Sequence, residues 1–342
     1  MGEQAVKTVG EVARLIPAEL RQQQATQSWA TFFRVFFMLF VTQWALWLTP
    51  DGMVFWPLKA VLIFLAGLSF VGIFVLGHDC GHYSFSSKRW VNDVVGTLCH
   101  LPILNGFYAW RAAHDFHHRQ TQIRKVDPDW PELLYTETEK APWYEKLAVR
   151  LGPGSPVGIF IGFWVGMLKR ALFGLLIPQM PVRSGEKWKI YLHTIVSFSI
   201  AVVLLREYYQ LIGGAKFVEM YVLPAIIGTS FGALLTFMHH THEGSPVFDR
   251  ENYEPYQAQV EATWNVRFPR FMEWMWLDIN IHLPHHVLPN LPWYQLRTAT
   301  EILRKTRPEL VKEKQWSWKT MRESWRATKL EETGVGQYRL KS

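Results

Sequence analysis

Residues 60–82 read AVLIFLAGLSFVGIFVLGHDCGH: an uncharged run over residues 60–77, then two histidines, His78 and His82. A helix of this length rises about 27 Å, close to the ~30 Å hydrocarbon core of a bilayer. Histidines four residues apart project from one face of a helix. The stretch therefore predicts a membrane-spanning helix that presents two imidazoles at one end.

Three other stretches share this uncharged, apolar character, and basic residues beside them, such as Arg34 and Lys189, can snorkel to the membrane surface. Helices buried in a soluble protein are the alternative, but four such stretches would need a very large soluble core to cover them. We therefore expect an all-α integral membrane protein with four transmembrane helices, at about residues 35–49, 60–77, 190–205 and 221–238.

Two more apolar stretches are interrupted. Residues 94–110 contain Pro102 and Gly106, and residues 156–180 contain a Lys-Arg pair. Breakers and charges suit segments that lie in the membrane interface or re-enter it. We expect both to be interfacial.

The basic residues are distributed unevenly about the four spans. Of the 36 Lys and Arg, only Lys59, Arg206 and Lys216 fall in the two connections at the outer side. The positive-inside rule then places both termini and the long middle segment in the cytoplasm. The first thirty residues are polar and suggest no signal peptide. The expected organisation is a cytoplasmic segment 1–30, a membrane domain 31–300 and a charged cytoplasmic tail 301–342. The parts on the cytoplasmic side are expected to form a helical cap on the bundle.

Composition excludes several classes of protein. The chain has 342 residues, 49% of them hydrophobic, with a net charge of +7, so it is too apolar for a disordered protein. Its two cysteines, Cys80 and Cys99, provide neither a disulfide framework nor the four ligands of an iron–sulfur cluster. The topology explains the positive charge and no binding motif is present, so nucleic acid is not an expected partner.

Histidines give the strongest functional signal. Two of the thirteen, His100 and His193, stand alone and are expected to be buried bystanders. The other eleven form four groups that all fall on the cytoplasmic side. One ion rarely takes more than four imidazoles, so these groups predict a two-metal site. The groups are His78 and His82; His114, His117 and His118; His239, His240 and His242; and His282, His285 and His286.

Neither the HExxH motif of hydrolytic zinc enzymes nor the Glu-x-x-His pattern of soluble di-iron bundles is present. From the residues alone, iron, copper and zinc all remain open.

The motifs HDCGH (78–82), HDFHH (114–118) and HLPHH (282–286) resemble the three histidine boxes of membrane fatty acid desaturases. The segments 77–96 and 278–297 look most like the acyl-lipid Δ12 (ω6) desaturases of cyanobacteria and plastids. Pro284 in the third box is a feature that ω3 relatives commonly lack. The chain departs from many relatives at Trp264 and Asn265, which leaves the lining of the substrate pocket undefined.

This resemblance implies a non-haem di-iron centre that uses O₂ to desaturate oleoyl chains of membrane glycerolipids. It also implies an external electron donor, with ferredoxin expected, and a location in the plasma or thylakoid membrane if the source is cyanobacterial. After the fourth span, His240 is the preferred ligand, with His239 and His242 as further candidates. The remaining implied iron ligands are His78, His82, His114, His117, His118, His282, His285 and His286.

Carboxylates near the boxes are expected to accept the outer N–H of ligand imidazoles. The candidates are Asp79, Asp115 and Asp278, although a capping or surface role is open for the first two. The basic residues Lys88, Arg89, Arg119, Arg124 and Lys125 either attract an acidic donor, or hold lipid phosphates, or simply reflect topology.

Several alternatives share the histidine boxes: a desaturase of other regiochemistry (ω3 or Δ9), a fatty acid or carotenoid hydroxylase, and a ketolase. A membrane metal transporter is the alternative outside enzymes. Transport sites lie near the bilayer midplane, whereas these histidines follow the inner ends of the spans, which disfavours transport.

Overall fold

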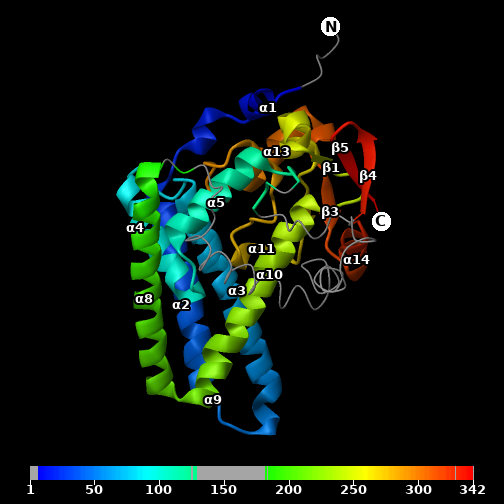
Figure 1. Cartoon of the computed structure of the whole chain (residues 1–342). Helices are drawn as coiled ribbons and strands as arrows, with labels where there is room; N and C mark the ends of the chain where they lie inside the picture. The colour runs from blue at the N-terminus through cyan, green and yellow to red at the C-terminus, as the bar shows by residue number, and fades with distance from the viewer. Residues whose placement is uncertain (1–6, 125, 129–181, 183, 328, 342) are drawn as a thin grey trace, which may run out of the picture.

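The computed structural model describes residues 7–124, 126–128, 182, 184–327 and 329–341. Four long helices form a stem in which each helix is long and apolar enough to cross a membrane, as predicted (Figure 1). They run beyond the uncharged stretches because polar residues at their ends continue the helices into the cap. Three of them are α2 (Ala25–Leu48), α3 (Trp56–Gly81) and α8 (Lys187–Ile212); the fourth is α10 (Leu223–His240), preceded by α9 (Gly214–Phe217) and a π-helical turn (Val218–Val222).

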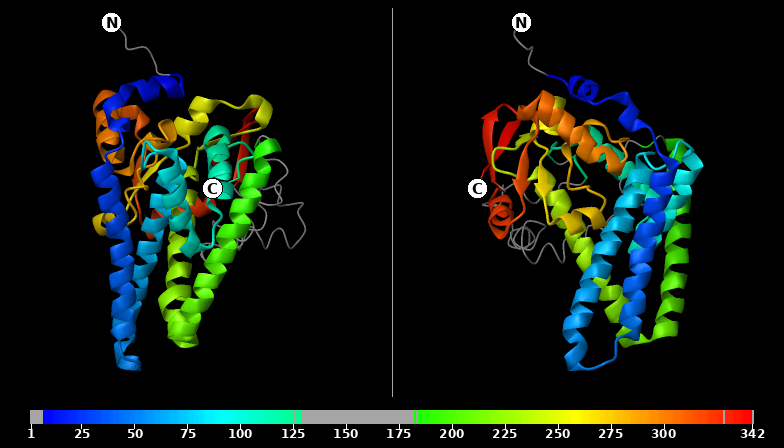
Figure 2. Two further views of the ribbon diagram at one scale, coloured as in Figure 1. Left: turned by 90° about the vertical axis from the view of Figure 1, so that its left-hand side faces the viewer. Right: turned by 180° about the vertical axis from the view of Figure 1, so that it is seen from behind.

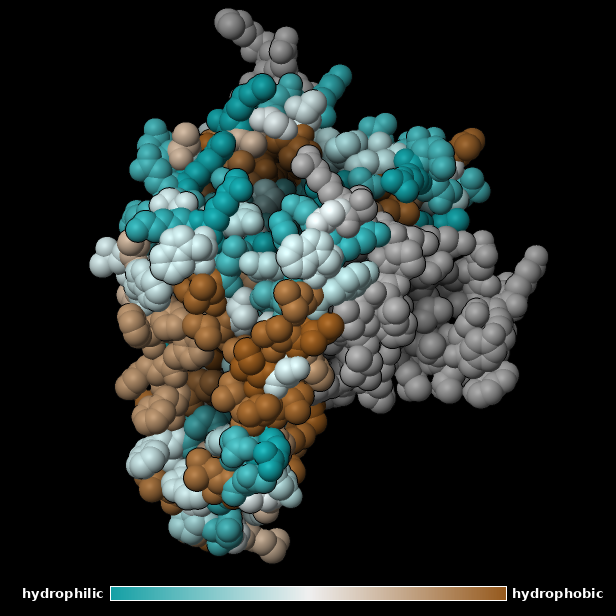
Figure 3. All heavy atoms as spheres, turned by 60° about the vertical axis from the view of Figure 1, so that its left-hand side comes forward, coloured by the Kyte–Doolittle hydropathy of each residue, from teal (hydrophilic) through white to brown (hydrophobic). Residues whose placement is uncertain are grey.

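The stem has an apolar outer surface. Phe33 and Phe37 on α2 are each 64% exposed, and Val203 on α8 is 55% exposed. Figure 3 shows a hydrophobic band on the visible face of the stem, with more hydrophilic surface above and below it. Such a large apolar surface on a folded protein indicates contact with lipid, so the chain is a membrane protein.

Two glycines allow α3 and α10 to pack closely in the middle of the stem. A Cβ added at Gly228 would lie 2.7 Å from the backbone oxygen of Gly67, which is closer than real Cβ contacts allow. Small residues at such crossings let membrane helices approach until their backbones touch. The crossing fixes the direction in which the cap ends of α3 and α10 converge.

Between α3 and the third span, the chain forms α4 (Arg89–His100), a 3-10 turn (Leu101–Ile103) and α5 (Phe107–Gln120). The predicted interfacial segment 94–110 thus spans the end of one helix and the start of the next. It bends at Leu104, whose φ is +52°, just before Gly106. The other predicted interfacial segment, 156–180, lies outside the described residues.

The cap covers one end of the stem, and both α1 and β5 belong to it (Figures 1 and 2). The structure is mostly helical, as predicted, but the cap also contains short strands. These form an antiparallel sheet in the order β1-β5-β4 and a parallel pair of β2 and β3. Its helices are α1 (Val9–Leu15), α11 (Arg270–Met275), α12 (Leu283–Val287), α13 (Leu296–Thr306) and α14 (Trp318–Arg326); its strands are β1 (Pro246–Phe248), β2 (Asn265–Arg267), β3 (Glu313–Gln315), β4 (Lys329–Gly334) and β5 (Gln337–Lys341).

The C-terminal segment is integrated into the cap. Leu340 on β5 and Met321 on α14 are buried in the main hydrophobic core, together with Leu76 and Met238 from the stem. One core therefore runs from the stem into the cap. Movement of the cap helices relative to the stem would cost buried apolar contacts, so the histidines that they carry are held firmly.

Candidate metal centre

Four helices bring the predicted histidines together from distant parts of the sequence. The first box sits at the cap end of α3, and the second box lies along α5. The third box begins at His282, directly before the short helix α12, and the last two residues of α10 are His239 and His240. The predicted convergence of the four histidine groups at one end of the bundle is therefore seen, because all four meet where the stem joins the cap.

Five imidazoles form a first cluster: His78, His82, His114, His118 and His285. One nitrogen from each lies within 4.8 Å of all the others. The Nε2 atom of His114 is 2.9 Å from Nε2 of His78 and 3.1 Å from Nε2 of His118. Nε2 of His118 is also 3.0 Å from Nε2 of His285. Two imidazole nitrogens bound about 2.1 Å from one ion at about 90° lie about 3.0 Å apart, so these separations fit ligands of a single ion.

A second cluster lies beside the first. It joins His117, His240 and His286, again with nitrogens within 4.8 Å of one another. Nε2 of His282 lies 3.0 Å from Nε2 of His286, which adds a fourth imidazole. The rings of His286 and His118 are 4.5 Å apart, so the two clusters are direct neighbours.

Of the three histidines after the fourth span, only His240 belongs to a cluster. His239 stacks on the ring of His282 with 3.8 Å between the ring centres. His242 has its Nε2 atom 2.6 Å from the carbonyl oxygen of Met238 and its Nδ1 atom 3.4 Å from the hydroxyl of Ser324. His239 and His242 therefore lie outside the sets of converging nitrogens.

The clusters suit a cation because a neutral imidazole keeps one nitrogen with a free lone pair. Burial, reinforced by neighbouring histidines, lowers the pKa well below the usual range for histidine, so the imidazoles are neutral at pH 7. Neutral imidazole is the form that binds metals, and nitrogen lone pairs only 3 Å apart repel unless a cation or proton lies between them. The donor set thus fits two metal ions. The histidines whose pKa is lowered in this way are His82, His118, His282, His285 and His286.

The three predicted carboxylates have different roles. Asp79 Oδ1 lies 3.6 Å from His78 Nδ1, while its other oxygen accepts a hydrogen bond from the backbone N–H of Trp293. Asp115 approaches His82 Nδ1 at 3.9 Å, which is too long for a hydrogen bond. Asp278 instead accepts hydrogen bonds from Arg270 and Arg297. Its expected role as an imidazole acceptor is therefore not seen.

Two hydrogen-bond acceptors for the imidazoles were missed in the sequence. The carboxylate of Asp127 lies 2.7 Å from Nδ1 of His117, and both side chains are buried. The amide oxygen of Gln259 lies 2.8 Å from Nδ1 of His286. Acceptors at these positions fix the ring orientation and leave Nε2 as the nitrogen that binds metal. No spacing pattern in the sequence indicates Gln259. For Asp127, the available signal was its position as a carboxylate in the loop after the second box.

The third box is held by its backbone. The side-chain oxygen of Asn265 accepts hydrogen bonds from the backbone N–H groups of His282 and Leu283, at 2.8 and 3.0 Å. These are the donors at the start of α12 that would otherwise have no partner. Asn265 therefore caps the short helix that carries His285 and His286.

A charged network lies behind this segment. Glu273 is fully buried and accepts hydrogen bonds from Arg267, Arg297 and the side-chain amide of Asn280. Burial raises the pKa of the Glu273 carboxyl, but the hydrogen bonds outweigh it and hold the pKa below its ordinary value. Asn280 precedes the third box by two residues, so the network fixes the approach of the chain to that box.

The two lone histidines lie outside both clusters. His100 is fully buried against Phe74 and Trp110, and neither of its nitrogens has a hydrogen-bond partner among the described residues. Burial lowers its pKa to about 3. His193 stacks on Tyr108 and has a nitrogen 2.9 Å from the hydroxyl of Thr97. His100 is thus buried, as expected, whereas His193 is only partly buried and links α8 to α4 and α5.

Comparison with known proteins adds an independent line of support. The profile of the fatty acid desaturase family matches residues 55–318 of the chain. The chain is 30% identical over 269 residues to the sn-1 oleoyl-lipid 12-desaturase of Arthrospira platensis, covering 78% of this chain and 75% of that protein. It is 28% identical over 316 residues to the chloroplastic omega-6 fatty acid desaturase of Glycine max, covering 92% of this chain and 71% of that protein. It is 27% identical over 316 residues to the sn-1 oleoyl-lipid 12-desaturase of Synechocystis sp., covering 92% of this chain and 86% of that protein.

Proposed function

Because the chain belongs to the fatty acid desaturase family, we propose that it introduces a cis double bond at Δ12 of oleoyl chains in membrane glycerolipids, using O₂ and a non-haem di-iron centre. As an acyl-lipid desaturase the chain is an oxidoreductase. What we propose beyond this is the position of the new double bond, the cofactor and the partners of the enzyme. The observation that carries the proposal is the pair of adjacent clusters of buried imidazoles at the junction of stem and cap.

The Δ12 position is supported by the similar proteins. Relatives from two cyanobacteria and from a plant chloroplast carry the names 12-desaturase or omega-6 desaturase. The third box of this chain also contains Pro284, a feature that ω3 relatives commonly lack.

We assign the first iron to His78, His82, His114, His118 and His285, and the second iron to His117, His240, His282 and His286. When bound, two iron ions supply the oxidising power, drawn from O₂, that removal of two hydrogens from an unactivated chain requires and that no side chain provides. His239 and His242 are not assigned as ligands, because their nitrogens do not converge with the others.

The protein's own residues prepare this site. Asp127 and Gln259 accept hydrogen bonds from Nδ1 of His117 and of His286, so each ring presents its Nε2 lone pair inward. Asn265 holds the start of the third box. Burial of the ligands favours the neutral form of imidazole and keeps water out of the site, which limits side reactions.

We propose that electrons come from another protein. The two cysteines are both buried, and two thiols are too few for an iron–sulfur cluster. The donor would be a soluble protein of the ferredoxin type on the cytoplasmic side, and the excess of Lys and Arg supports the same side for the clusters and both termini. The exposed Arg119, one residue beyond His118, is suited to attract an acidic protein near the site.

The other proposals follow from this arrangement. Residues 31–300 would form the membrane desaturase domain, with residues 1–30 and 301–342 cytoplasmic, and the enzyme would lie in a plasma or thylakoid membrane. A desaturase of other regiochemistry or a hydroxylase would use the same ligands, so product analysis must separate them.

The experiment is expression in a host that supplies ferredoxin and oleoyl lipids but has no Δ12 desaturase. Total fatty acids are analysed by gas chromatography, with the double bonds located by mass spectrometry. A new diene with double bonds at positions 9 and 12 is expected. A hydroxylated product or a double bond elsewhere would point to the alternatives, and no new product despite verified expression would contradict the proposal.

A further inference from the structure

Helix α14 has a buried face and a strongly basic exposed face. Met321 and Ser324 on the inner face are buried, and Ser324 contacts His242 in the cap. On the outer face, Trp318 is 69% exposed, and three basic side chains accompany it. These are Lys319, Arg322 and Arg326, all exposed.

Among the described residues, the three cations on this face have no acidic partner, since no Asp or Glu oxygen lies within the 4.0 Å of an ion pair from any of them. Other basic residues of the C-terminal region do form such pairs: Arg307 with Glu309 at 2.6 Å, and Lys341 with Glu331 at 2.7 Å. Three uncompensated positive charges beside a single Glu323 make α14 a site of local positive potential.

The same side chains surround a shallow depression. It has a volume of about 330 Å³, and the described residues that line it are Trp318, Lys319, Arg322, Glu323 and Arg326. A phosphate group with its substituents fits in such a space and can accept hydrogen bonds from more than one guanidinium group. The depression thus offers charge and shape to one anionic headgroup.

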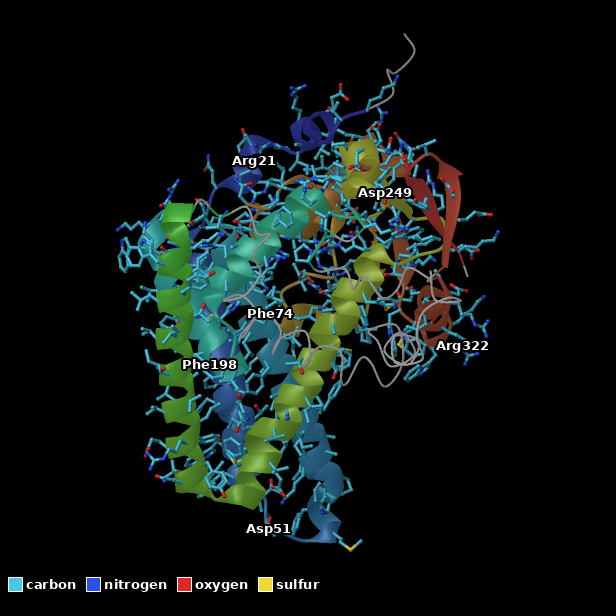
Figure 4. The ribbon with its side chains drawn as sticks, viewed as in Figure 1. Arg21, Asp51, Phe74, Phe198, Asp249 and Arg322 are labelled. Atoms are coloured by element: carbon cyan, nitrogen blue, oxygen red, sulfur yellow. The ribbon has the colours of Figure 1, made fainter. Side chains whose placement is uncertain are left out.

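The position of α14 relative to the stem indicates where that headgroup comes from. In Figure 1, α14 lies below β4 and β5, on the side of the cap from which the spans extend. Figure 4 shows Arg322 well below Asp249. A basic helix on this side of the cap faces the bilayer in which the spans lie, and an exposed tryptophan such as Trp318 is a side chain that favours the membrane interface.

We propose that the outer face of α14 binds the phosphate headgroups of anionic membrane lipids and thereby docks the cap onto the bilayer. The indole of Trp318 would insert among the lipid headgroups, while Lys319, Arg322 and Arg326 neutralise phosphate charge. Clustered cations are attracted to an anionic membrane surface, and the attraction increases with each added cation, so the three together can hold the helix at the bilayer. This surface is separate from the metal centre and goes beyond the proposed catalytic function.

The test compares two bilayers. The full-length protein is reconstituted into nanodiscs of phosphatidylcholine alone, or of phosphatidylcholine with about one third phosphatidylglycerol, and amide hydrogen exchange of residues 318–326 is followed by mass spectrometry. Exchange in α14 is expected to be about fivefold slower in the anionic bilayer, corresponding to about 1 kcal/mol of added protection. High salt should remove this difference.

A matched pair of variants separates local binding from a general charge effect. Replacement of Lys319, Arg322 and Arg326 by Gln should abolish the lipid-dependent protection. A control that removes three charges elsewhere in the cap, Arg14→Gln with Arg250→Gln and Lys305→Gln, should keep it. Equal exchange of α14 in both bilayers, or equal loss in both variants, would overturn the proposal. Because the only other protein in the sample is the nanodisc scaffold, which is the same in both bilayers, an acidic protein partner as the true occupant would appear as absence of the lipid effect.

Discussion

The imidazole Nδ1 of His117 lies 2.7 Å from the carboxylate of Asp127, and both side chains are buried. The second oxygen of Asp127 accepts a hydrogen bond from the backbone N–H of Gln122. The carboxylate is thus held in place by the loop that follows α5. It fixes the ring of His117 so that Nε2 turns toward His240 and His286.

This contact predicts the behaviour of Asp127 variants. Asp127→Ala should weaken iron binding about 10–100-fold, because the ring of His117 loses its orientation and some basicity. Asp127→Asn should lose less, since its amide oxygen can still accept the hydrogen bond. Iron affinity is measured by competition with a chelator. Asp93→Asn is the control, because Asp93 pairs with Arg111 away from the ligands; an equal loss in Asp93→Asn would contradict the assignment.

His117 and His100 are both fully buried histidines, yet they should respond differently to substitution. His117→Ala should abolish desaturation, since it removes a nitrogen from the second cluster. His100→Leu should retain most activity, because the ring of His100 packs against aromatic side chains outside both clusters. Diene formation per unit of folded protein is the measurement. An inactive His100→Leu protein together with an active His117→Ala protein would reverse the assignment.

Glu273 is expected to govern stability near the third box. Glu273→Ala leaves Arg267 and Arg297 without their buried partner and should lower the free energy of unfolding by about 3 kcal/mol. Glu301→Ala removes an exposed ion pair with Arg304 and should change it by no more than about 0.5 kcal/mol. Denaturation in detergent measures both. A small effect at Glu273 would mean that the network does not support the box.

Acid should destabilise the metal-free protein through its buried neutral histidines. Burial lowers the pKa of His100 and of His242 to about 3, against about 6.5 in an unfolded chain. Between these values the unfolded state binds more protons than the folded state. The stability contributed by each histidine is therefore complete above about pH 6.5, and below that pH it falls by about 1.4 kcal/mol per pH unit. Between about pH 6.5 and pH 3, unfolding of the wild type should take up one more proton than unfolding of His100→Leu. The free energy of unfolding of the variant should therefore fall less steeply as the pH decreases. Equal slopes would contradict the buried, neutral state of His100.

Sequence patterns predicted the spans and the convergence of the boxes, because both depend on periodicity and on the side of the membrane. They did not predict partners that require a particular loop path. Asp278 was expected near an imidazole because it precedes His282 by four residues, but Leu277 and Asp278 have φ of +59° and +54°. This left-handed backbone breaks the helical spacing, and the carboxylate turns to Arg270 and Arg297 instead. Gln259 lies in a π-helical turn and the strands of the cap are short, so neither has a periodic signature.

The metal content of the purified, active protein tests the central claim most directly. Two irons per chain are expected, because the imidazoles form two neighbouring clusters rather than one. His117→Ala should lower the ratio toward one, since it removes a ligand from only the second cluster. One iron per chain in the fully active wild type, or stoichiometric zinc in protein purified from its native host, would contradict the di-iron assignment.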